Sequence, residues 1–305
     1  MSPASSPFPA SSPFSASSPS SAASGFSASP ASPDAPTPAP APSPSSPSTA
    51  SSRTSLLAVL RAAGCVFAEE EAELILDAAR TPAEAAAMAE RRAAGLPLEL
   101  VVGWAAFRGL RIAVAPGVFV PRRRTEFLVE QALLQAPDAR VVVDLCCGAG
   151  AVAAALAAGL GPVELHAADV DPAAVRCARG TIGPLGGHVH QGDLFEALPG
   201  ALRGRVGILA ANVPYVPSGE IALLPQEARD HEPRVALDGG GDGLDVLRRV
   251  AAGAPDWLAP GGCVLVETSR DQTPAAVTVF ESHGLAARPA VSEELHAHVV
   301  IGVRT

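Results

Sequence analysis

The sequence lacks lysine altogether, since all 22 basic residues among its 305 are arginines. A Walker-type phosphate loop needs a lysine, so that class of nucleotide site is excluded. Acidic residues outnumber basic ones by 31 to 22, which gives a formal net charge of −9. Because nucleic-acid phosphates attract cationic surfaces, this balance argues against a nucleic-acid partner.

The chain also lacks an apolar run of the roughly 18 residues that a membrane span needs, so we expect no membrane association. Its N-terminus has neither a basic region nor an apolar core, which predicts no secretory signal and a cytoplasmic protein. The cysteines show no metal-binding or redox spacing, which favours reduced thiols and no metal site. They are Cys65, Cys146, Cys147, Cys177 and Cys263.

Large apolar and charged residues are scarce at the N-terminus. The first 50 residues hold 18 Ser, 13 Pro and 11 Ala, and Asp34 is their only charged residue. Such a segment cannot bury enough apolar surface to offset the entropy cost of ordering. The composition therefore predicts a disordered tail over 1–52, while the remaining ~250 residues suffice for a sizeable core.

Helical patterns follow the tail. Residues 68–80 place Ala72, Ile75 and Leu76 on one face at helical spacing. The segment 81–84 reads Thr-Pro-Ala-Glu, which has the form of a capping box with proline at the first helical position. These patterns predict a small helical domain over 53–97, followed by a β-hairpin linker over 98–122 that turns at Arg108-Gly109.

Strands and helices alternate over the rest of the chain, 123–305. Such alternation with apolar strands predicts an α/β fold, in which helices cover both faces of a parallel sheet. The expected strands are 141–145, 163–170, 188–193, 206–212, 263–267, 285–290 and 296–303. The expected helices are 125–135, 150–159, one that begins at 172, 243–252 and 273–283.

A loop of small residues joins the first of these strands to its helix. Small residues let the backbone approach a ligand, and ligands of open α/β sheets bind outside the carboxyl ends of the strands. The loop lacks the G-x-G-x-x-G pattern that cradles a pyrophosphate. We therefore expect a phosphate-free nucleoside here, and its candidate binding residues are Asp144, Cys146, Cys147, Gly148, Ala149 and Gly150.

Two further acids close the next two strands. Asp169 ends the second strand, where a carboxylate can accept two hydrogen bonds from ribose hydroxyls. Asp193 ends the third strand. A sulfonium nucleoside carries no phosphate and suits acids in these places, whereas Asp171 before Pro172 is interpreted as a helix cap.

The segment Asn212-Val213-Pro214-Tyr215 follows the fourth strand. Val213 precedes proline and is extended, so its carbonyl is free to accept a hydrogen bond, and the Asn212 side-chain oxygen is a second acceptor. Two adjacent acceptors match the two N–H bonds of a planar amino group, and Tyr215 offers a ring face. These residues suit methylation of an amide or exocyclic amine, with catalysis mostly by positioning.

Together these motifs resemble the S-adenosylmethionine-dependent protein-(glutamine-N5) methyltransferases that modify peptide chain release factors. The resemblance spans about 55–303 and rests on GLPLELVVGWAAFRGLRIAVAPGVFVPRRRTEFLVEQAL (95–133), VVVDLCCGAGAVA (141–153), AADVDPAAVRCAR (167–179), QGDLF (191–195), NVPYVP (212–217), HEPRVALDGGGDGLDVLRRV (231–250) and GGCVLVETSRDQ (261–272). It implies a Rossmann-like methyltransferase domain over 123–305, and a helical domain over 53–97 that helps to grip the release factor.

The resemblance also implies roles for individual residues. The loop from Cys146 to Gly150 would lie along S-adenosylmethionine, Asp169 would hold its ribose, and Asp193 and Leu194 would flank its adenine. Asn212, Val213, Pro214 and Tyr215 would hold a glutamine side chain, in the Gly-Gly-Gln motif of a release factor. Asn212 would also contact S-adenosylmethionine. The residues that match the segment bordering the active site are Phe119, Arg122, Thr125 and Glu126.

The chain departs from the family at three places. Cys146 replaces a glycine, which would strain the backbone if the position requires a positive φ. Arg123-Arg124 replaces a Pro-Glu pair and reverses the charge beside the active site. Val213 replaces a proline, but its carbonyl can serve equally well. The departures point to an altered protein target more than to altered chemistry.

Two other functions remain open from the sequence. An adenine-N6 methyltransferase would use the same pair of acceptors, although the negative net charge and the lack of a basic domain argue against it. A binding protein for S-adenosylmethionine without catalysis is the third interpretation, motivated by Cys146 and Arg123-Arg124.

Four further features receive non-catalytic interpretations. The pairs His188/His190 and His296/His298 would each share a strand face, but no acid or cysteine completes a metal site. The glycine-rich run 239–243 is expected to be a flexible turn before a helix. Glu267 and Gln272 are expected to cap a helix.

Overall fold

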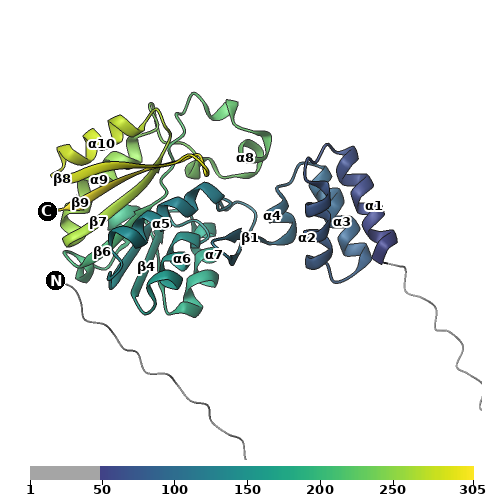
Figure 1. Cartoon of the computed structure of the whole chain (residues 1–305), viewed down its shortest axis with the longest axis horizontal. Coiled ribbons are helices and arrows are strands. Elements are labelled where there is room, and N and C mark those ends of the chain that lie inside the picture. Colours follow the sequence, from purple (N-terminus) through teal and green to yellow (C-terminus); the bar gives the residue numbers. More distant parts are fainter. Residues whose placement is uncertain (1–48) are drawn as a thin grey trace, which may run out of the picture. The chain divides into compact units, whose positions relative to one another are not determined.

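The computed structural model describes residues 49–305. Of the tail expected to be disordered over 1–52, residues 1–48 lie outside the described residues, and the expectation is wrong for 49–52, which are helical. The first helix, α1 (Thr49–Ala62), begins ahead of residue 53, where the sequence places the start of helical structure (Figure 1). No helix in the described part of the chain is both long and apolar enough to cross a membrane.

Four helices come first. α1 is followed by α2 (Ala68–Ala78), α3 (Pro82–Ala93) and the single-turn helix α4 (Leu98–Val102), which lies where the sequence suggested only linker. Their small core is apolar and separate from the cores around the sheet, and its largest buried residues include Leu56, Leu60, Ile75, Met88 and Val101.

The predicted capping box at α3 forms in part. The Thr81 hydroxyl accepts a hydrogen bond from the Glu84 backbone N–H at 3.1 Å, as expected. The Glu84 carboxylate accepts from the Arg80 backbone N–H at 2.9 Å, one residue before the position that a complete box requires. Because the carboxylate also pairs with the Arg80 guanidinium, it is drawn toward that residue.

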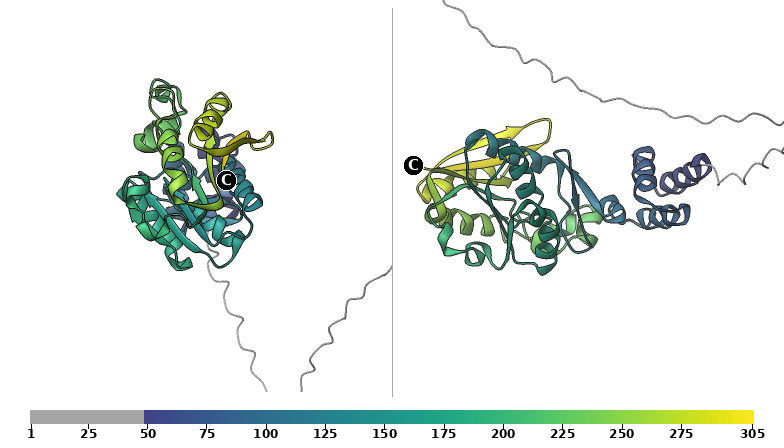
Figure 2. Two further views of the ribbon diagram at one scale, coloured as in Figure 1. Left: turned by 90° about the vertical axis from the view of Figure 1, so that its left-hand side faces the viewer. Right: turned by 90° about the horizontal axis from the view of Figure 1, so that it is seen from below.

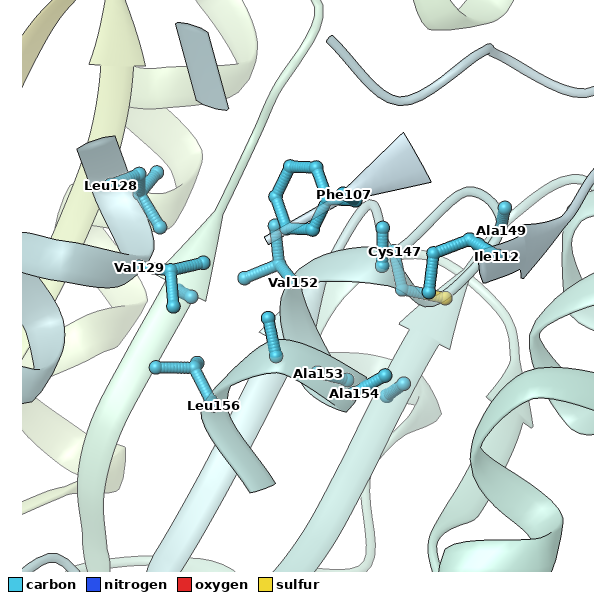
Figure 3. Packing of buried hydrophobic residues seen from close by; sticks show 14 of the residues in the cluster. Phe107, Ile112, Leu128, Val129, Cys147, Ala149, Val152, Ala153, Ala154 and Leu156 are labelled. Carbon is cyan, nitrogen blue, oxygen red and sulfur yellow. The ribbon is translucent and has the colours of Figure 1, made fainter. Parts of the chain in front are cut away.

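The predicted hairpin is confirmed. β1 (Trp104–Phe107) pairs antiparallel with β2 (Leu110–Ala113), and the turn residues Arg108 and Gly109 both have positive φ. Phe107 and Ile112 pack with Val152 and Cys147 in one buried cluster (Figure 3). The hairpin therefore covers the start of α6 (Ala151–Leu160) and the glycine loop before it.

A seven-stranded sheet forms the second part of the chain, in the order β5-β4-β3-β6-β7-β9-β8. Its strands are β3 (Val141–Leu145), β4 (Glu164–Asp169), β5 (His188–Gln191), β6 (Val206–Ala211), β7 (Leu258–Thr268), β8 (Leu285–Ser292) and β9 (Ala297–Arg304). The expectation of a parallel sheet is confirmed for β5, β4, β3, β6 and β7, and it fails at one edge, where β9 pairs antiparallel with both β7 and β8. Only a few residues join β8 to β9, and so short a connection permits only antiparallel pairing.

Helices cover both faces of this sheet, as expected (Figure 2). α5 (Glu126–Gln135), α6 and α7 (Pro172–Ile182) share one hydrophobic cluster with one face. α9 (Asp245–Trp257) and α10 (Thr273–Ser282) share the other cluster. In β3, Val142 belongs to the first cluster and Val143 to the second, because successive strand side chains point to opposite faces.

The segment between β6 and α9 carries no element in the sequence interpretation. It contains a short helix, α8 (Gln226–His231), and two 3-10 turns, Ile221–Leu223 and Arg234–Ala236. The other 3-10 turns are Arg123–Thr125, Gly183–Leu185, Leu194–Ala197 and Gly200–Leu202. Such single turns bury no periodic apolar face, so hydrophobic spacing does not predict them.

The cap of α3 gives a testable prediction. Thr81→Ala removes the acceptor for the Glu84 N–H and should lower the free energy of unfolding by about 1 kcal/mol. Urea unfolding measures this change. The matched control is Thr278→Ala, whose hydroxyl bonds only to the Pro274 carbonyl within α10. Equal stability losses in the two variants would contradict the cap.

Candidate active site

A cavity of about 540 Å³ opens at the carboxyl ends of the parallel strands. It is lined by residues from loops that follow β3, β4, β5 and β6, and its volume lies in the range of small-molecule sites. The structure brings most of the sequence-predicted site residues to it: Asp144, Cys146, Cys147, Gly148, Ala149, Asp169, Asp193, Leu194, Asn212, Val213, Pro214 and Tyr215. Phe119, Arg122 and Thr125 also line it.

Gly150 and Glu126 are not among the lining residues. Gly150 precedes α6 with φ +78°, and a Cβ there would lie 3.3 Å from Ala178, so its role is to let α6 and α7 approach. The Glu126 carboxylate instead accepts the Arg108 backbone N–H at 2.9 Å and holds the hairpin turn.

The glycine loop has a left-handed backbone at alternate positions. Cys146 has φ +55°, Gly148 +52° and Gly150 +78°. Cys146 therefore occupies a conformation that costs a side-chain-bearing residue roughly 1–2 kcal/mol, as anticipated for a replaced glycine. Burial raises the pKa of both the Cys146 and Cys147 thiols, so they stay protonated at neutral pH and act as small apolar groups.

Two carboxylates accept backbone hydrogen bonds within and just after this loop. Asp144 is 1% exposed and accepts the Ala153 backbone N–H at 3.0 Å, at the start of α6. The two oxygens of Asp169 accept the backbone N–H groups of Gly148 and Asp171, both at 2.9 Å. Burial raises the pKa of Asp169 and raises that of Asp144 to about 7.

Asp193 and Leu194 also line the cavity. The Asp193 carboxylate pairs with the Arg249 guanidinium at 2.7 Å, and both side chains are about half exposed. Leu194 is buried and has φ +45°, a second side-chain-bearing residue in the left-handed region at this cavity.

The segment 212–215 is named the amide-binding loop after the role that its sequence predicts. A side-chain hydrogen bond fixes it at its first residue. The Asn212 amide Nδ2 donates to the Thr125 hydroxyl at 3.3 Å, and Thr125 is 3% exposed. This bond fixes the orientation of the side-chain amide and leaves Oδ1 as an acceptor. Val213 is also buried.

Hydrogen bonds hold both the hydroxyl and the backbone carbonyl of Tyr215. Its hydroxyl donates to Glu267 Oε1 at 2.9 Å and accepts from Arg124 Nη2 at 2.7 Å. Its backbone carbonyl accepts from Gln272 Nε2 at 2.8 Å. The interpretation of Glu267 as a helix cap is wrong, because it lies within β7 and its carboxylate binds Arg124 and Tyr215. That of Gln272 is incomplete: it exchanges hydrogen bonds with Ser269, but its Nε2 supports the loop.

The glycine-rich run 239–243 precedes α9, as expected, and it packs closely against the same loop. A Cβ at Gly243 would lie 2.3 Å from both the Tyr215 carbonyl oxygen and Gln272 Nε2. A Cβ at Gly239 would lie 2.7 Å from the Pro214 carbonyl oxygen. Glycine is thus required here by close backbone approach, and the run of glycines was the sequence signal.

Glu232 is a site residue that sequence reasoning missed. Its side chain is 1% exposed, and Oε1 accepts from Arg122 at 2.5 Å and from the Val120 backbone N–H at 3.2 Å. Burial raises the pKa of this carboxyl. Because it follows α8 in an irregular segment, no periodic pattern in the sequence places it at the cavity.

The histidines lie elsewhere. His188 and His190 stack with His166 of β4, and His166 Nδ1 lies 2.9 Å from His190 Nε2. His296 does not share a strand face with His298 as expected, because it precedes β9 and has φ +48°. Among residues 49–305, no three potential ligands gather into a metal site.

Comparisons with known proteins show similarity to methyltransferases. The family model of the methyltransferase small domain matches residues 109–215. The release factor glutamine methyltransferase of Geobacter sulfurreducens is 38% identical over 196 residues, which cover 64% of this chain and 68% of the relative. That of Bradyrhizobium diazoefficiens is 33% identical over 261 residues, which cover 78% of this chain and 88% of the relative.

A solved structure agrees on the fold. A methyltransferase from Pyrococcus furiosus superposes with a TM-score of 0.50 over 65% of this chain and 90% of that chain, at 16% identity. This likeness confirms the expected Rossmann-like fold class.

Close packing at Gly243 predicts a large stability effect. Gly243→Ala adds a Cβ that overlaps two polar atoms at a left-handed position, and should cost at least about 2 kcal/mol of unfolding free energy. The control is Gly241→Ala, where a Cβ meets nothing within 4 Å. Urea unfolding of both variants checks this, and a Gly243→Ala protein as stable as Gly241→Ala would contradict the packing.

The raised pKa of Asp144 predicts that the stability of the protein depends on pH. This pKa is raised from 3.8 to about 7, so between these values the folded protein holds a proton that the unfolded chain releases. Its contribution to stability is therefore full below about pH 4 and declines as the pH rises to about 7. Asp144→Asn keeps an acceptor for the Ala153 N–H without the charge.

The unfolding free energies of wild type and Asp144→Asn should thus diverge across this range. Urea unfolding should be measured at a series of pH values. From about pH 4 to about pH 7 the unfolding free energy of the variant should rise relative to that of wild type, and above pH 7 the difference should stay constant. The exposed Asp138→Asn is the matched control for loss of one negative charge. A difference that does not vary with pH would refute a buried, protonated Asp144.

Proposed function

The chain belongs to the release factor glutamine methyltransferase family, and from that premise we propose that it transfers a methyl group from S-adenosylmethionine to the side-chain amide of a glutamine in a peptide chain release factor. The target is the glutamine of a Gly-Gly-Gln motif. The observation that carries the proposal is the amide-binding loop, which brings two carbonyl-type acceptors to a cavity that also contains the glycine loop and Asp169.

The residues present fit S-adenosylmethionine. The residues of the glycine loop are small, so little side chain lies between its main chain and the cavity. Asp169 would hold the ribose: each carboxylate oxygen accepts one backbone N–H and keeps further capacity for a hydroxyl. Asp193 and Leu194 would flank the adenine. When bound, the cofactor supplies an electrophilic methyl group.

The amide-binding loop supplies positioning. Asn212 Oδ1 and the Val213 carbonyl would each accept one N–H of the glutamine amide, which fixes the direction of its nitrogen lone pair. Pro214 keeps Val213 extended, and Tyr215 presents its ring to the planar amide. The replacement of proline by Val213 leaves this geometry intact, because the backbone carbonyl does the work.

No strong base is required. The amide proton becomes acidic once the nitrogen carries a fourth bond, so water can remove it. Tyr215 does not serve as a base at neutral pH, because burial and the neighbouring Glu267 carboxylate raise the pKa of its phenol.

The other parts of the chain take supporting roles in this proposal. The helical domain over 53–97 would contact the release factor, the hairpin linker over 98–122 would cover the glycine loop, and the methyltransferase domain over 123–305 would carry the chemistry. Because release factors act on the ribosome, the reaction belongs in the cytoplasm.

Transfer of labelled methyl groups tests the proposed function. Purified chain and labelled S-adenosylmethionine are incubated with a release factor, with the same factor carrying Gln→Ala in its Gly-Gly-Gln motif, and with DNA. Label on the unmodified factor alone is expected. Label on DNA, or equal label on both factors, would overturn the proposal.

Asn212 should be essential in this assay. Asn212→Ala removes one of the two amide acceptors and should lower kcat by about 100-fold or more, a larger loss than any weakening of S-adenosylmethionine binding. Isothermal titration measures that binding separately. Full activity in Asn212→Ala would show that the amide is held elsewhere.

A further inference from the structure

Arg124, Glu267 and Tyr215 form a closed triangle of hydrogen bonds beside the amide-binding loop. Arg124 Nη2 donates to the Tyr215 hydroxyl at 2.7 Å, and Arg124 Nε donates to Glu267 Oε1 at 2.9 Å. The Tyr215 hydroxyl completes the triangle by donating to the same Glu267 oxygen at 2.9 Å. Each member thus restrains the other two.

Arg124 is central to the triangle because it is the cation that pairs with the buried Glu267 carboxylate. The Glu267 side chain is 1% exposed, and its Oε2 has no hydrogen-bond partner among the described residues. Arg124 is its ion-pair partner at 2.9 Å and remains 43% exposed. A buried carboxylate without its cation is strongly disfavoured, so loss of Arg124 would leave the Glu267 charge unpaired and displace its side chain.

The turn that carries Arg124 holds both ends of the amide-binding loop. Arg124 contacts Tyr215, and its neighbour Thr125 accepts from Asn212 Nδ2 at 3.3 Å. The Gln272 bond then fixes the Tyr215 backbone independently of its ring. The ring orientation therefore depends on the Arg124–Glu267 pair.

We propose that Arg124 is a positioning residue for methyl transfer, which acts through Glu267 and the Tyr215 hydroxyl to hold the tyrosine ring against the substrate amide. The inference rests on the proposed function. From the sequence, the arginine at this position is expected to alter the protein target. In the proposal it has instead a role in orienting the reacting amide.

A double-mutant cycle tests this route of action. Arg124→Met and Tyr215→Phe should each lower kcat by about tenfold, and the double variant should be no more than about twofold slower than either single variant. The KM for S-adenosylmethionine should stay unchanged. Arg123→Met is the matched control, since that exposed arginine lies next in sequence outside the triangle, and it should retain wild-type kcat.

Losses that multiply in the double variant, or wild-type kcat in Arg124→Met, would overturn the inference. If Arg124→Met does not fold, Arg124→Lys replaces it in the cycle, because lysine keeps the charge beside Glu267 without the planar fork that binds both partners.

A second readout needs no substrate. The chain contains a single tyrosine, so protein labelled with ¹³C at the tyrosine ring carbon that bears the hydroxyl gives one NMR resonance. This resonance should shift in Arg124→Met and stay in place in Arg123→Met. If wild type fails to methylate the release factor, the proposed function fails, and an unchanged resonance in Arg124→Met would separately overturn the triangle.

Discussion

The hydrogen bond from Gln272 to the Tyr215 carbonyl depends on the absence of a side chain at Gly243, and this close contact governs the rest of the site. A Cβ at that position would overlap both partners, so only glycine lets the glycine run pack this closely against the amide-binding loop. Rigid backbone is what a positioning catalyst requires, because an acceptor displaced by 1 Å loses much of its effect.

Two arginine–glutamate pairs supply the electrostatic part of that rigidity. Arg122 binds Glu232 and Arg124 binds Glu267, and each carboxylate is almost wholly inaccessible while its arginine reaches solvent. A buried carboxylate is tolerable only with its cation and its hydrogen bonds in place. The arginines that the sequence presents as one basic run therefore act as two separate supports of the cavity wall.

The sequence predicted the elements that repeat a pattern and missed those that depend on packing. Alternating apolar strands and helices indicated the α/β sheet, and the small-residue loop pointed to the cavity. The antiparallel edge at β9 and the burial of Glu232 could not be foreseen, because strand direction and side-chain partners depend on tertiary contacts. Gln272 shows the same limit, since its local cap was predictable but its bond to Tyr215, 57 residues away in sequence, was not.

In the proposed reaction, Asn212 and Val213 hold both N–H groups of a glutamine amide. The most direct test is a crystal structure of the chain with S-adenosylhomocysteine, the cofactor without its methyl group, and a Gly-Gly-Gln peptide. The amide nitrogen should lie within hydrogen-bond distance of both Asn212 Oδ1 and the Val213 carbonyl oxygen. A glutamine side chain bound away from these two atoms would contradict it.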